Sequence, residues 1–457
     1  MIGDFLEPLP GLTLAFACTV GVLFALYVGL LIVVYLGDRP SPAGDRSLFD
    51  WHFLVPCRDE EAVIGDTIRY LRLTFPYAHV WVVDDDSGDR TAEITKRLRL
   101  DGGQDERIHL VRRFRPDART GKGDALNAGY RALRQWAGQG VDPDRTVVVV
   151  VDADGRPAPD CLAVCAADHL FGDAKVGAVQ VDVRMLNCGM PPPSVGWGRR
   201  YFGRALVRMQ DLEFRAAIAA IQMSRRFTGS VAMGGNGQFT RLSALDSIAG
   251  PHGQPWRGSL LEDFELGVYL LTEGWRTRFT ADTHVAQEAL YSMRRFLAQR
   301  TRWDQGAMQC ARHVPRIWHS PHVSLWGFAE MMYYLAQPWM RLLGTLVYLV
   351  PLLLLAVDTL HDSELTWRWF TASGWVPCTV AGSWGLLSFL WGPIYWVRWG
   401  RSGSPLRGLA YGAVYAMYVN LFYLTSWRAL TRLLRGHNSW AKTRRNRELD
   451  GVVTIYH

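Results

Sequence analysis

Five consecutive valines at positions 147–151 constrain the fold of this chain more than any other feature. A β-branched run of this length has no polar face, so it predicts a strand that is buried on both sides. Such strands belong to parallel sheets that carry helices on both faces. Similar short runs alternate with stretches of helical periodicity from residue 48 to about residue 281. The sequence therefore predicts an α/β domain with a largely parallel sheet.

The same patterns locate the individual elements of this domain. Apolar, β-branched runs predict strands at 51–56, 78–85, 108–113, 145–154 and 176–183. Apolar residues at helical spacing predict helices at 61–73, 91–100, 124–137, 159–171, 200–223 and 262–273.

Long apolar segments flank the domain and predict a membrane protein. Residues 11–36 carry no charge and are long enough to cross a bilayer as one helix. Because acidic residues precede this segment and Arg39 and Arg46 follow it, the positive-inside rule places the next domain in the cytoplasm. Three further apolar stretches lie at about 338–357, 375–397 and 408–427. We therefore expect a multi-pass protein of the cell (plasma) membrane, with membrane lipids as partners, and the number of C-terminal spans stays open.

These features divide the chain into five parts. They are an N-terminal transmembrane anchor and linker (1–46), the α/β domain (47–290), a segment with interfacial helices (291–337), C-terminal transmembrane helices (338–430) and a basic tail (431–457).

The distribution of charge indicates which partners to expect. The formal net charge is +7, and arginine and lysine are dense at 294–302 and 428–447, beside apolar segments. This placement suits anionic lipid or a phosphate-bearing substrate, and we expect no nucleic acid partner. The seven cysteines form no CxxC pair, which indicates reduced, structural thiols.

Two carboxylates end the valine run and predict a metal site. In an extended segment alternate residues point the same way, so Asp152 and Asp154 can share one cation. Oxygen ligands suit Mg²⁺ or Mn²⁺, which substrate phosphate oxygens often complete. A surface turn is the alternative, and it fits poorly with so buried a strand.

Two further acidic groups have both a structural and a functional explanation. Asp84, Asp85 and Asp86 crowd after a strand, where a turn with a helix cap would explain them as well as a binding site would. Glu262 and Asp263 start an amphipathic helix. They would complement the helix dipole, or one of them would act as a general base.

Two glycine-rich segments supply polar groups between these acids. Lys122 lies between two glycines and could approach a diphosphate closely, although the spacing is not that of a P-loop. The loop at 227–241 carries Ser230, Asn236 and Gln238, whose donors and acceptors suit sugar hydroxyls. A flexible connector is the alternative explanation for this loop.

The order of all these motifs resembles one family. VPCRDEE, VVDDDS, GKGDALN, DAD, TGS…GNGQFTR, ED and QRTRW follow one another between residues 48 and 310. This order resembles the family 2 glycosyltransferases, in particular the membrane-integrated processive branch that includes cellulose, hyaluronan, chitin and poly-N-acetylglucosamine synthases. The resemblance implies a GT-A fold, Rossmann-like with a mostly parallel sheet, in a cytoplasmic domain inserted between transmembrane helices.

The resemblance also implies a role for each motif residue. It assigns the catalytic base to Asp263, with Glu262 beside it in the catalytic pair, and the metal, Mg²⁺ or Mn²⁺, to Asp152 and Asp154. It assigns the nucleotide-sugar site to Pro56, Glu60, Glu61, Asp84, Asp85, Lys122, Asp152, Gln299 and Arg302. The acceptor site would comprise Trp303, together with Ser230 and Asn236 of the glycine-rich loop.

The arginines and tryptophan at 299–303 also have a purely structural explanation, because both residue types favour the membrane interface. In a transferase, arginine would bind the departing diphosphate and the indole would pack against a sugar ring. Three features depart from the family pattern. Leu261 replaces the usual Thr, Asp86 replaces Gly, and the loop that begins at Ser230 is longer than the common form.

The sequence therefore predicts a processive, inverting hexosyltransferase. It would polymerise a β-linked polysaccharide from a UDP-sugar donor, UDP-N-acetylglucosamine or UDP-glucose, and pass the growing polysaccharide acceptor across the membrane. The alternative is a non-processive polyprenyl-phosphate or lipid-linked glycosyltransferase. A third possibility is a membrane scaffold that only senses nucleotide sugars, which the retained Asp263, Asp152 and Asp154 disfavour.

Overall fold

The chain forms two compact units in the computed structural model. It describes residues 10–101, 104–138, 140–190, 196–346, 356–357, 360, 363–369, 371, 385–400 and 404–437. One unit comprises Met1–Gly37 and Ala336–Arg428, and the other comprises Asp38–Leu335 and Ala429–His457. The second unit holds every predicted site residue.

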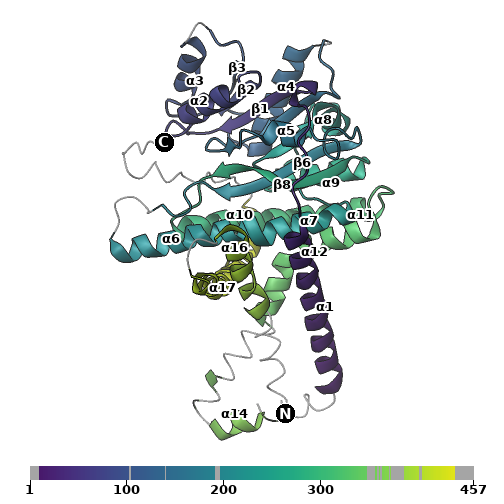
Figure 1. The fold of residues 1–457 in the computed structure, drawn as a ribbon, viewed down its shortest axis with the longest axis vertical. Coiled ribbons are helices and arrows are strands. Elements are labelled where there is room, and N and C mark those ends of the chain that lie inside the picture. Colours follow the sequence, from purple (N-terminus) through teal and green to yellow (C-terminus); the bar gives the residue numbers. More distant parts are fainter. Residues whose placement is uncertain are drawn as a thin grey trace. The chain divides into compact units, whose positions relative to one another are not determined.

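An eight-stranded mixed sheet is the centre of this second unit (Figure 1). In spatial order the strands are β3 (Ile108–Arg113), β2 (His79–Asp85), β1 (Asp50–Cys57), β4 (Thr146–Val150), β7 (Gln238–Arg241), β6 (Val176–Met185), β8 (Arg276–Gln287) and β5 (Arg156–Pro157). β1 runs parallel to β2 and β4, and β2 runs parallel to β3. The carboxyl ends of these four strands therefore meet at one edge of the sheet.

The largely parallel sheet predicted from the sequence is only partly right, because β7 is antiparallel to both of its neighbours, β4 and β6. Beyond it, β8 is parallel to β6 and β5 is antiparallel to β8. The apolar pattern of the sequence does not predict β7, because Gln238, Thr240 and Arg241 are polar and yet buried. The insertion of β7 brings the loop before it next to the end of β4.

The valine run is buried on both sides, as predicted. Val147, Val149 and Val151 pack in one hydrophobic cluster with α2 (Ile64–Thr74) and α5 (Cys161–Cys165). Val148 and Val150 pack in another, on the opposite face, with α4 (Lys122–Ala137), α8 (Leu242–Ala249) and α9 (Glu262–Thr272). Alternate valines thus join the two halves of the core.

Most of the predicted helices of this domain are confirmed. α2, α3 (Thr91–Leu100), α4 and α9 lie where the periodicity placed them. The helix predicted at 159–171 is wrong beyond α5, because turns follow Cys165. A short 3-10 helix, η2 (Arg46–Leu48), precedes β1.

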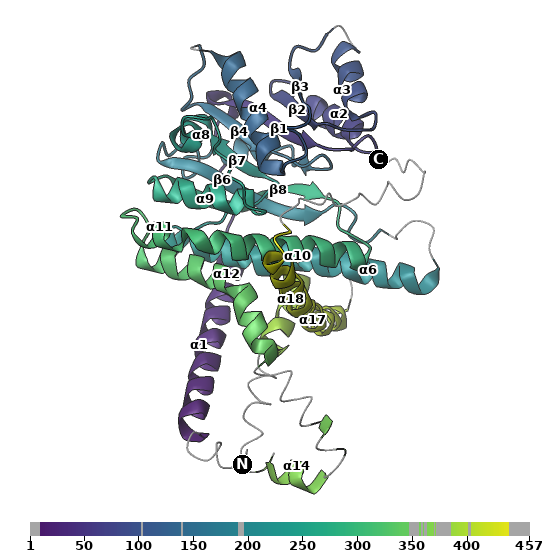
Figure 2. The same cartoon turned by 180° about the vertical axis from the view of Figure 1, so that it is seen from behind.

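A long helical run lies along the sheet and contacts a second helix. The run consists of α6 (Trp197–Leu212), the π-helical η3 (Glu213–Ile218) and α7 (Ala219–Thr228). Figures 1 and 2 show it beside α10 (Met293–Cys310), beneath β6 and β8. η4 (Ala311–His313), α11 (Val314–Trp318) and α12 (Leu325–Gly344) follow.

Arg300 joins these two helical layers. Its Nη1 and Nη2 donate to the two carboxylate oxygens of Glu213 at 3.0 and 2.7 Å, and Arg300 is only 5% exposed. The guanidinium also lies 4.1 Å from the centroid of the Trp303 ring. Arg300 is therefore a buried ion-pair partner, and interfacial anchoring does not explain it.

The first unit contains α1 (Pro10–Gly37), α14 (Ser363–Trp369), α16 (Trp391–Trp399) and α17 (Leu406–Tyr418), with parts of α12 and α18 (Leu421–Leu434). Glycines let α16 approach α17, since a Cβ on Gly392 would lie 2.0 Å from the nitrogen of Gly412. The predicted segments 338–357 and 375–397 lie partly outside the described residues, as does the basic tail from residue 438. Across the described part of the chain, no helix combines the length and the apolar character that a membrane crossing needs.

Removing one partner of the Arg300 ion pair should destabilise the protein strongly. Arg300→Ala leaves the Glu213 carboxylate buried without its bidentate donor, which we expect to cost about 3–5 kcal/mol in the free energy of unfolding. The double variant Arg300→Leu/Glu213→Leu should recover most of this loss because neither charge remains. Thermal unfolding of the three proteins tests this, and equal stability of Arg300→Ala and wild type would contradict it.

Candidate active site

Lys122 is the centre of the candidate site. It is the first residue of α4, and its Nζ donates to Asp152 Oδ1 and to the carbonyl oxygen of Gly235, both at 2.6 Å. A Cβ on Gly235 would lie 2.9 Å from this Nζ and 3.1 Å from Asp263 Oδ2, so only glycine fits between them. Burial lowers the pKa of Lys122, but Asp152, Glu262 and Asp263 outweigh it and raise that pKa. The site therefore keeps a permanent ammonium group among three carboxylates.

Glu262 and Asp263 begin α9, as predicted, and face the same ammonium. Burial, and then the charge of Asp263, raise the pKa of Glu262 to about 7. Burial also raises the pKa of Asp263, although Lys122 and the backbone N–H of Phe264, which donates to Oδ1 at 2.7 Å, oppose the rise. Two neighbouring carboxyl groups with raised pKa values are suited to proton transfer near neutral pH.

Three contacts fix the turn that leads into Glu262. The side-chain amide of Asn127 donates to the carbonyl oxygen of Trp256 at 2.7 Å and accepts from its N–H at 3.0 Å. A Cβ on Gly306 of α10 would lie 2.6 Å from Cγ of Leu261, so α10 presses directly on this turn. Within α9, Glu265 accepts from the N–H of Ser259 at 3.0 Å. The position of Asp263 is thus set by α4, α9 and α10 together.

The three predicted site residues of α10 differ in how they relate to Glu262 and Asp263. The charge of Arg302 lowers the pKa of Glu262, which places its guanidinium near the acidic pair. Trp303 is half-buried and packs edge-on against Phe214 at 6.2 Å between ring centroids. Gln299 is half-buried on the same helix. Of these three residues of α10, Arg302 is therefore the one whose charge acts on the acidic pair.

The two polar residues predicted to bind the acceptor are engaged within the protein. Asn236 accepts from the N–H of Asp152 at 3.2 Å and donates to Gln287 Oε1 at 2.8 Å, so it holds the turn after β4. The Ser230 hydroxyl shares a hydrogen bond of 2.7 Å with that of Thr228 and is buried. The structure brings Asn236 to the acidic motif, where its role is to position Asp152.

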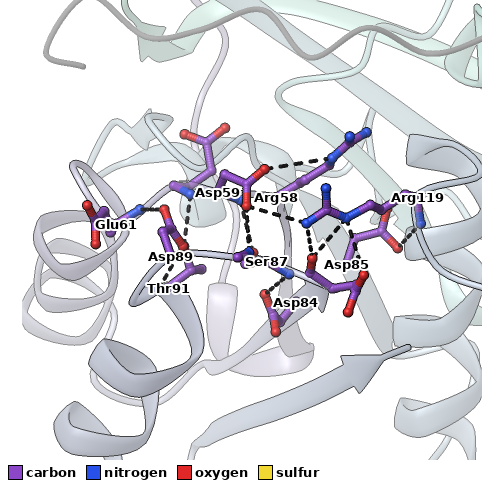
Figure 3. A network of polar contacts seen from close by, with 12 residues as sticks. Arg58, Asp59, Glu61, Asp84, Asp85, Ser87, Asp89, Thr91 and Arg119 are labelled. Atoms are coloured by element: carbon purple, nitrogen blue, oxygen red, sulfur yellow. Dashed lines mark hydrogen bonds and ion pairs between the residues drawn. The ribbon is translucent and has the colours of Figure 1, made fainter. Parts of the chain in front are cut away.

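A polar network lies at the carboxyl ends of β1 and β2, where the sequence predicts the uridine site (Figure 3). Asp84 accepts from the N–H of Ser87 at 3.3 Å and so closes the turn that the sequence allowed as an alternative. Asp85 accepts from the backbone N–H of Arg119 at 3.0 Å and from the guanidinium of Arg113. Both carboxylates therefore hold loops together.

Three residues of this network adopt left-handed backbone conformations. They are Asp59, Asp86 and Arg119, with φ of 54°, 57° and 65°. Glycine adopts a φ of this sign without strain, so the glycine that the family pattern implies at position 86 would fit this conformation. Arg119 Nε donates to the carbonyl oxygen of Asp86 at 2.9 Å, and Asp59 Oδ1 accepts from the N–H of Gly88 at 2.7 Å. Side-chain hydrogen bonds thus hold these strained backbone conformations in place. Strained conformations of this kind are common at binding sites.

The remaining predicted nucleotide residues lie beside this network. Glu60 is buried, and its N–H donates to Thr91 Oγ1 at 2.8 Å. The Glu61 carboxylate accepts from the backbone N–H and Nε of Arg90 at 3.2 and 3.1 Å. Pro56 lies in β1 opposite Val83 of β2.

Comparison with known proteins identifies the family. A model of the family described as "Glycosyltransferase like family 2" matches residues 51–306, which is more than half of the chain. The chain belongs to this family. Its fold is the Rossmann-like GT-A fold with a mixed sheet.

Relatives from several organisms are similar to this glycosyltransferase. The β-monoglucosyldiacylglycerol synthase of Synechocystis sp. is 30% identical over 277 residues, which cover 59% of this chain and 51% of that protein. An undecaprenyl-phosphate mannosyltransferase of Micrococcus luteus is 27% identical over 172 residues, covering 36% of this chain and 64% of that protein. The chain therefore spans about half the length of the first of these relatives.

One solved structure resembles the glycosyltransferase over most of its length. It is a mannosyltransferase from Pyrobaculum calidifontis in complex with GDP-Man and Mn²⁺, with a TM-score of 0.50 and 18% identity. The match covers 93% of this chain and 97% of that protein. This likeness supports the fold.

The donor set at the end of β4 fits a divalent cation. Asp152 is partly exposed, and Asp154 Oδ2 accepts from the N–H of Glu288 at 3.1 Å, so both carboxylates are held in place. Within the described residues no three acidic, histidine or cysteine side chains form a complete metal cage. Two hard oxygen donors with open positions suit Mg²⁺ or Mn²⁺ that substrate phosphates complete.

The arginines that hold the predicted uridine site were missed from the sequence. Parallel pairing of β2 and β3 sets Asp84 opposite Arg112 and Asp85 opposite Arg113. The signal was present, because an acidic run at the end of one strand precedes the arginine-rich segment 112–119 at the end of the next strand along the chain. Matching these opposite charges would have identified the pairing.

Replacing Glu262 should reveal its raised pKa as a pH-dependent change in stability. The folded chain binds this proton more tightly than the unfolded chain between pH 4.5 and about 7. The stability that the proton contributes is present below pH 4.5 and is lost as the pH rises through about 7. Glu262→Gln cannot ionise, so above this range it should be more stable than wild type by on the order of 1–3 kcal/mol.

Thermal unfolding across this pH range provides the measurement. The advantage of Glu262→Gln should shrink as the pH falls towards 4.5. Glu106→Gln, at an exposed carboxylate, is the matched control and should show no such trend. A Glu262→Gln advantage that is constant with pH would contradict a raised pKa.

Proposed function

We propose that this glycosyltransferase transfers a single hexosyl group from a UDP-sugar to a hydroxyl group of a membrane lipid, with inversion at the anomeric carbon. The observation that carries the proposal is the 30% identity to a protein named β-monoglucosyldiacylglycerol synthase. The similarity to a protein named undecaprenyl-phosphate mannosyltransferase supports a lipid acceptor as well. The sequence favoured polymer synthesis, and these relatives favour its alternative.

The environment of Trp303 also supports a single transfer. In a processive enzyme this indole would be a platform for the growing chain. Here Arg300 lies against the ring at 4.1 Å and Phe214 packs against its edge. These contacts give the indole a structural role within the α10 layer. Polymer synthesis remains the second candidate because the QRTRW segment is retained.

Asp263 is the base in the proposed reaction. It takes the proton from the acceptor hydroxyl as the oxygen attacks the anomeric carbon from the side opposite the diphosphate. The bond between that carbon and the phosphate oxygen breaks, UDP leaves with the electron pair, and an α-linked donor gives a β-linked product. Lys122 keeps part of the carboxylate pair ionised, and Glu262 can pass the proton onward.

Positive charge around the diphosphate assists its departure. Lys122 and Arg302 supply positive charge near the acidic pair, since the charge of each lowers the pKa of Glu262. Asp152 and Asp154 would hold Mg²⁺ or Mn²⁺, which neutralises charge on the leaving phosphates. For a lipid acceptor the catalytic unit must work at a membrane, and we place it at the cytoplasmic side of the cell membrane.

Asp263→Asn should abolish turnover while leaving donor binding intact. Removing a general base typically lowers the rate by about 10²–10⁴-fold, and the amide cannot accept the proton. UDP release gives kcat, and calorimetric titration with UDP gives affinity. Asp246→Asn is the matched control, since that carboxylate accepts from Tyr130 at 2.6 Å, two turns along α4 from Lys122, and it should retain activity. Near-normal turnover of Asp263→Asn would refute the assignment.

Product size tests the choice between lipid glycosylation and polymer synthesis. Purified protein with Mg²⁺ or Mn²⁺ is supplied with UDP-glucose, UDP-N-acetylglucosamine, UDP-galactose or UDP-glucuronate. Each reaction contains diacylglycerol, polyprenyl phosphate or no lipid. We expect lipid-dependent UDP release and a product carrying one hexose. A long polysaccharide formed without added lipid would overturn the proposal in favour of a polymerase.

A further inference from the structure

The first two turns of α6 expose aromatic and cationic side chains that the proposed reaction does not use. Trp197, Tyr201 and Phe202 are 85%, 71% and 50% exposed. Arg199, Arg200 and Arg204 are exposed on the same segment. Figures 1 and 2 both show this start of α6 extending past the strands of its unit. A helix end this rich in aromatic surface is typical of an interaction site.

Helical spacing sorts these side chains onto one face. Trp197, Arg200, Tyr201 and Arg204 follow one another at intervals of three, one and three, so they share one side of the helix, which we name the arginine–aromatic face. The Trp197 and Tyr201 rings stack with centroids 6.3 Å apart. The opposite side of the helix is buried at Leu206 and Gln210.

Charge identifies the partner of this face. The sequence from Val183 to Gln210 contains five arginines and no acidic residue. A surface with arginine between aromatic rings matches the boundary of a bilayer with anionic headgroups, where guanidinium groups meet phosphates and indole and phenol rings lie at headgroup level. We infer that the arginine–aromatic face docks the catalytic unit on an anionic membrane surface.

This membrane contact extends the proposed function and rests on it. Its purpose is to hold the catalytic unit where a lipid acceptor can reach it. α6 leads directly into η3, whose first residue, Glu213, pairs through its carboxylate with Arg300 of α10. α10 in turn presses on Leu261 beside the catalytic pair through Gly306. A helix anchored on headgroups is therefore connected to Asp263 through named contacts.

Photo-crosslinking of the full chain tests the contact directly. Tyr201→p-benzoylphenylalanine is reconstituted in nanodiscs of phosphatidylcholine, with or without phosphatidylglycerol. We expect a lipid adduct in both, with a yield about tenfold higher in the anionic discs because of the adjacent arginines. Trp136→p-benzoylphenylalanine is the matched control, since Trp136 is exposed on α4 on the far side of the sheet from α6, and should give no lipid adduct.

Charge variants distinguish the contribution of the arginines to the lipid contact from that of the aromatic rings. Adding Arg200→Ala and Arg204→Ala to the probe protein should abolish the preference for anionic discs, and Arg200→Lys with Arg204→Lys should restore it. UDP release in detergent should be unchanged in both variants, which shows that they are folded. Equal yields in neutral and anionic discs, no adduct, or an adduct with a second protein chain would each overturn the inference.

This readout is independent of catalysis. A lipid adduct without transfer to any lipid acceptor would reject the proposed function and keep the membrane contact. Transfer to lipid without an adduct at position 201 would reject the membrane contact and keep the proposed function.

Discussion

The ammonium group of Lys122 is the interaction on which the catalytic edge of this glycosyltransferase depends. Without it, Asp152, Glu262 and Asp263 would be like charges confined in a poorly solvated space, and their mutual repulsion would open the site. The lysine comes from the start of α4, the carboxylates come from β4 and α9, and the carbonyl of Gly235 completes the contacts. One cation therefore compensates the carboxylate charge of two segments of the chain and contacts a third. Burial raises the pKa values of the carboxyl pair and Lys122 opposes the rise, so the group that holds the site together also tunes its chemistry.

Much of the α/β fold could be predicted because it follows from the pattern of apolar residues. The valine run identified the central strand, and the spacing of apolar residues placed α9 with its acids at the first turn. Such features are local, since they depend on which side of an element is buried. Because the carboxyl ends of parallel strands meet at one edge of the sheet, the strand order alone predicts that the acidic motifs lie together there.

The remainder depends on polar groups that are buried by tertiary contacts. β7 is a strand of buried polar residues, so no apolar pattern marks it. The sequence predicts Asn236 at the acceptor site and does not reveal that its side chain orders the turn at Asp152. The role of Arg119 arises from a left-handed backbone and from contacts with Asp85 and Asp86, which are distant in the sequence. These roles require the three-dimensional pairing of segments, which a single sequence reveals only where opposite charges are as dense as in the 84–86 and 112–119 segments.

The antiparallel insertion of β7 has a consequence for the order in which the protein gains its structure. β7 must enter between β4 and β6 before Gly235 and Asn236 can reach Lys122 and Asp152, which lie 113 and 84 positions away in the chain. Contacts between such distant segments form late, because the entropy of closing long loops must be overcome first. The parallel strands β1, β2 and β3 can pair earlier, through shorter connections, and they contain no complete site. Catalytic competence is therefore among the last properties that the folding chain acquires, and a partly folded chain exposes its acidic strand ends without the lysine environment that neutralises them.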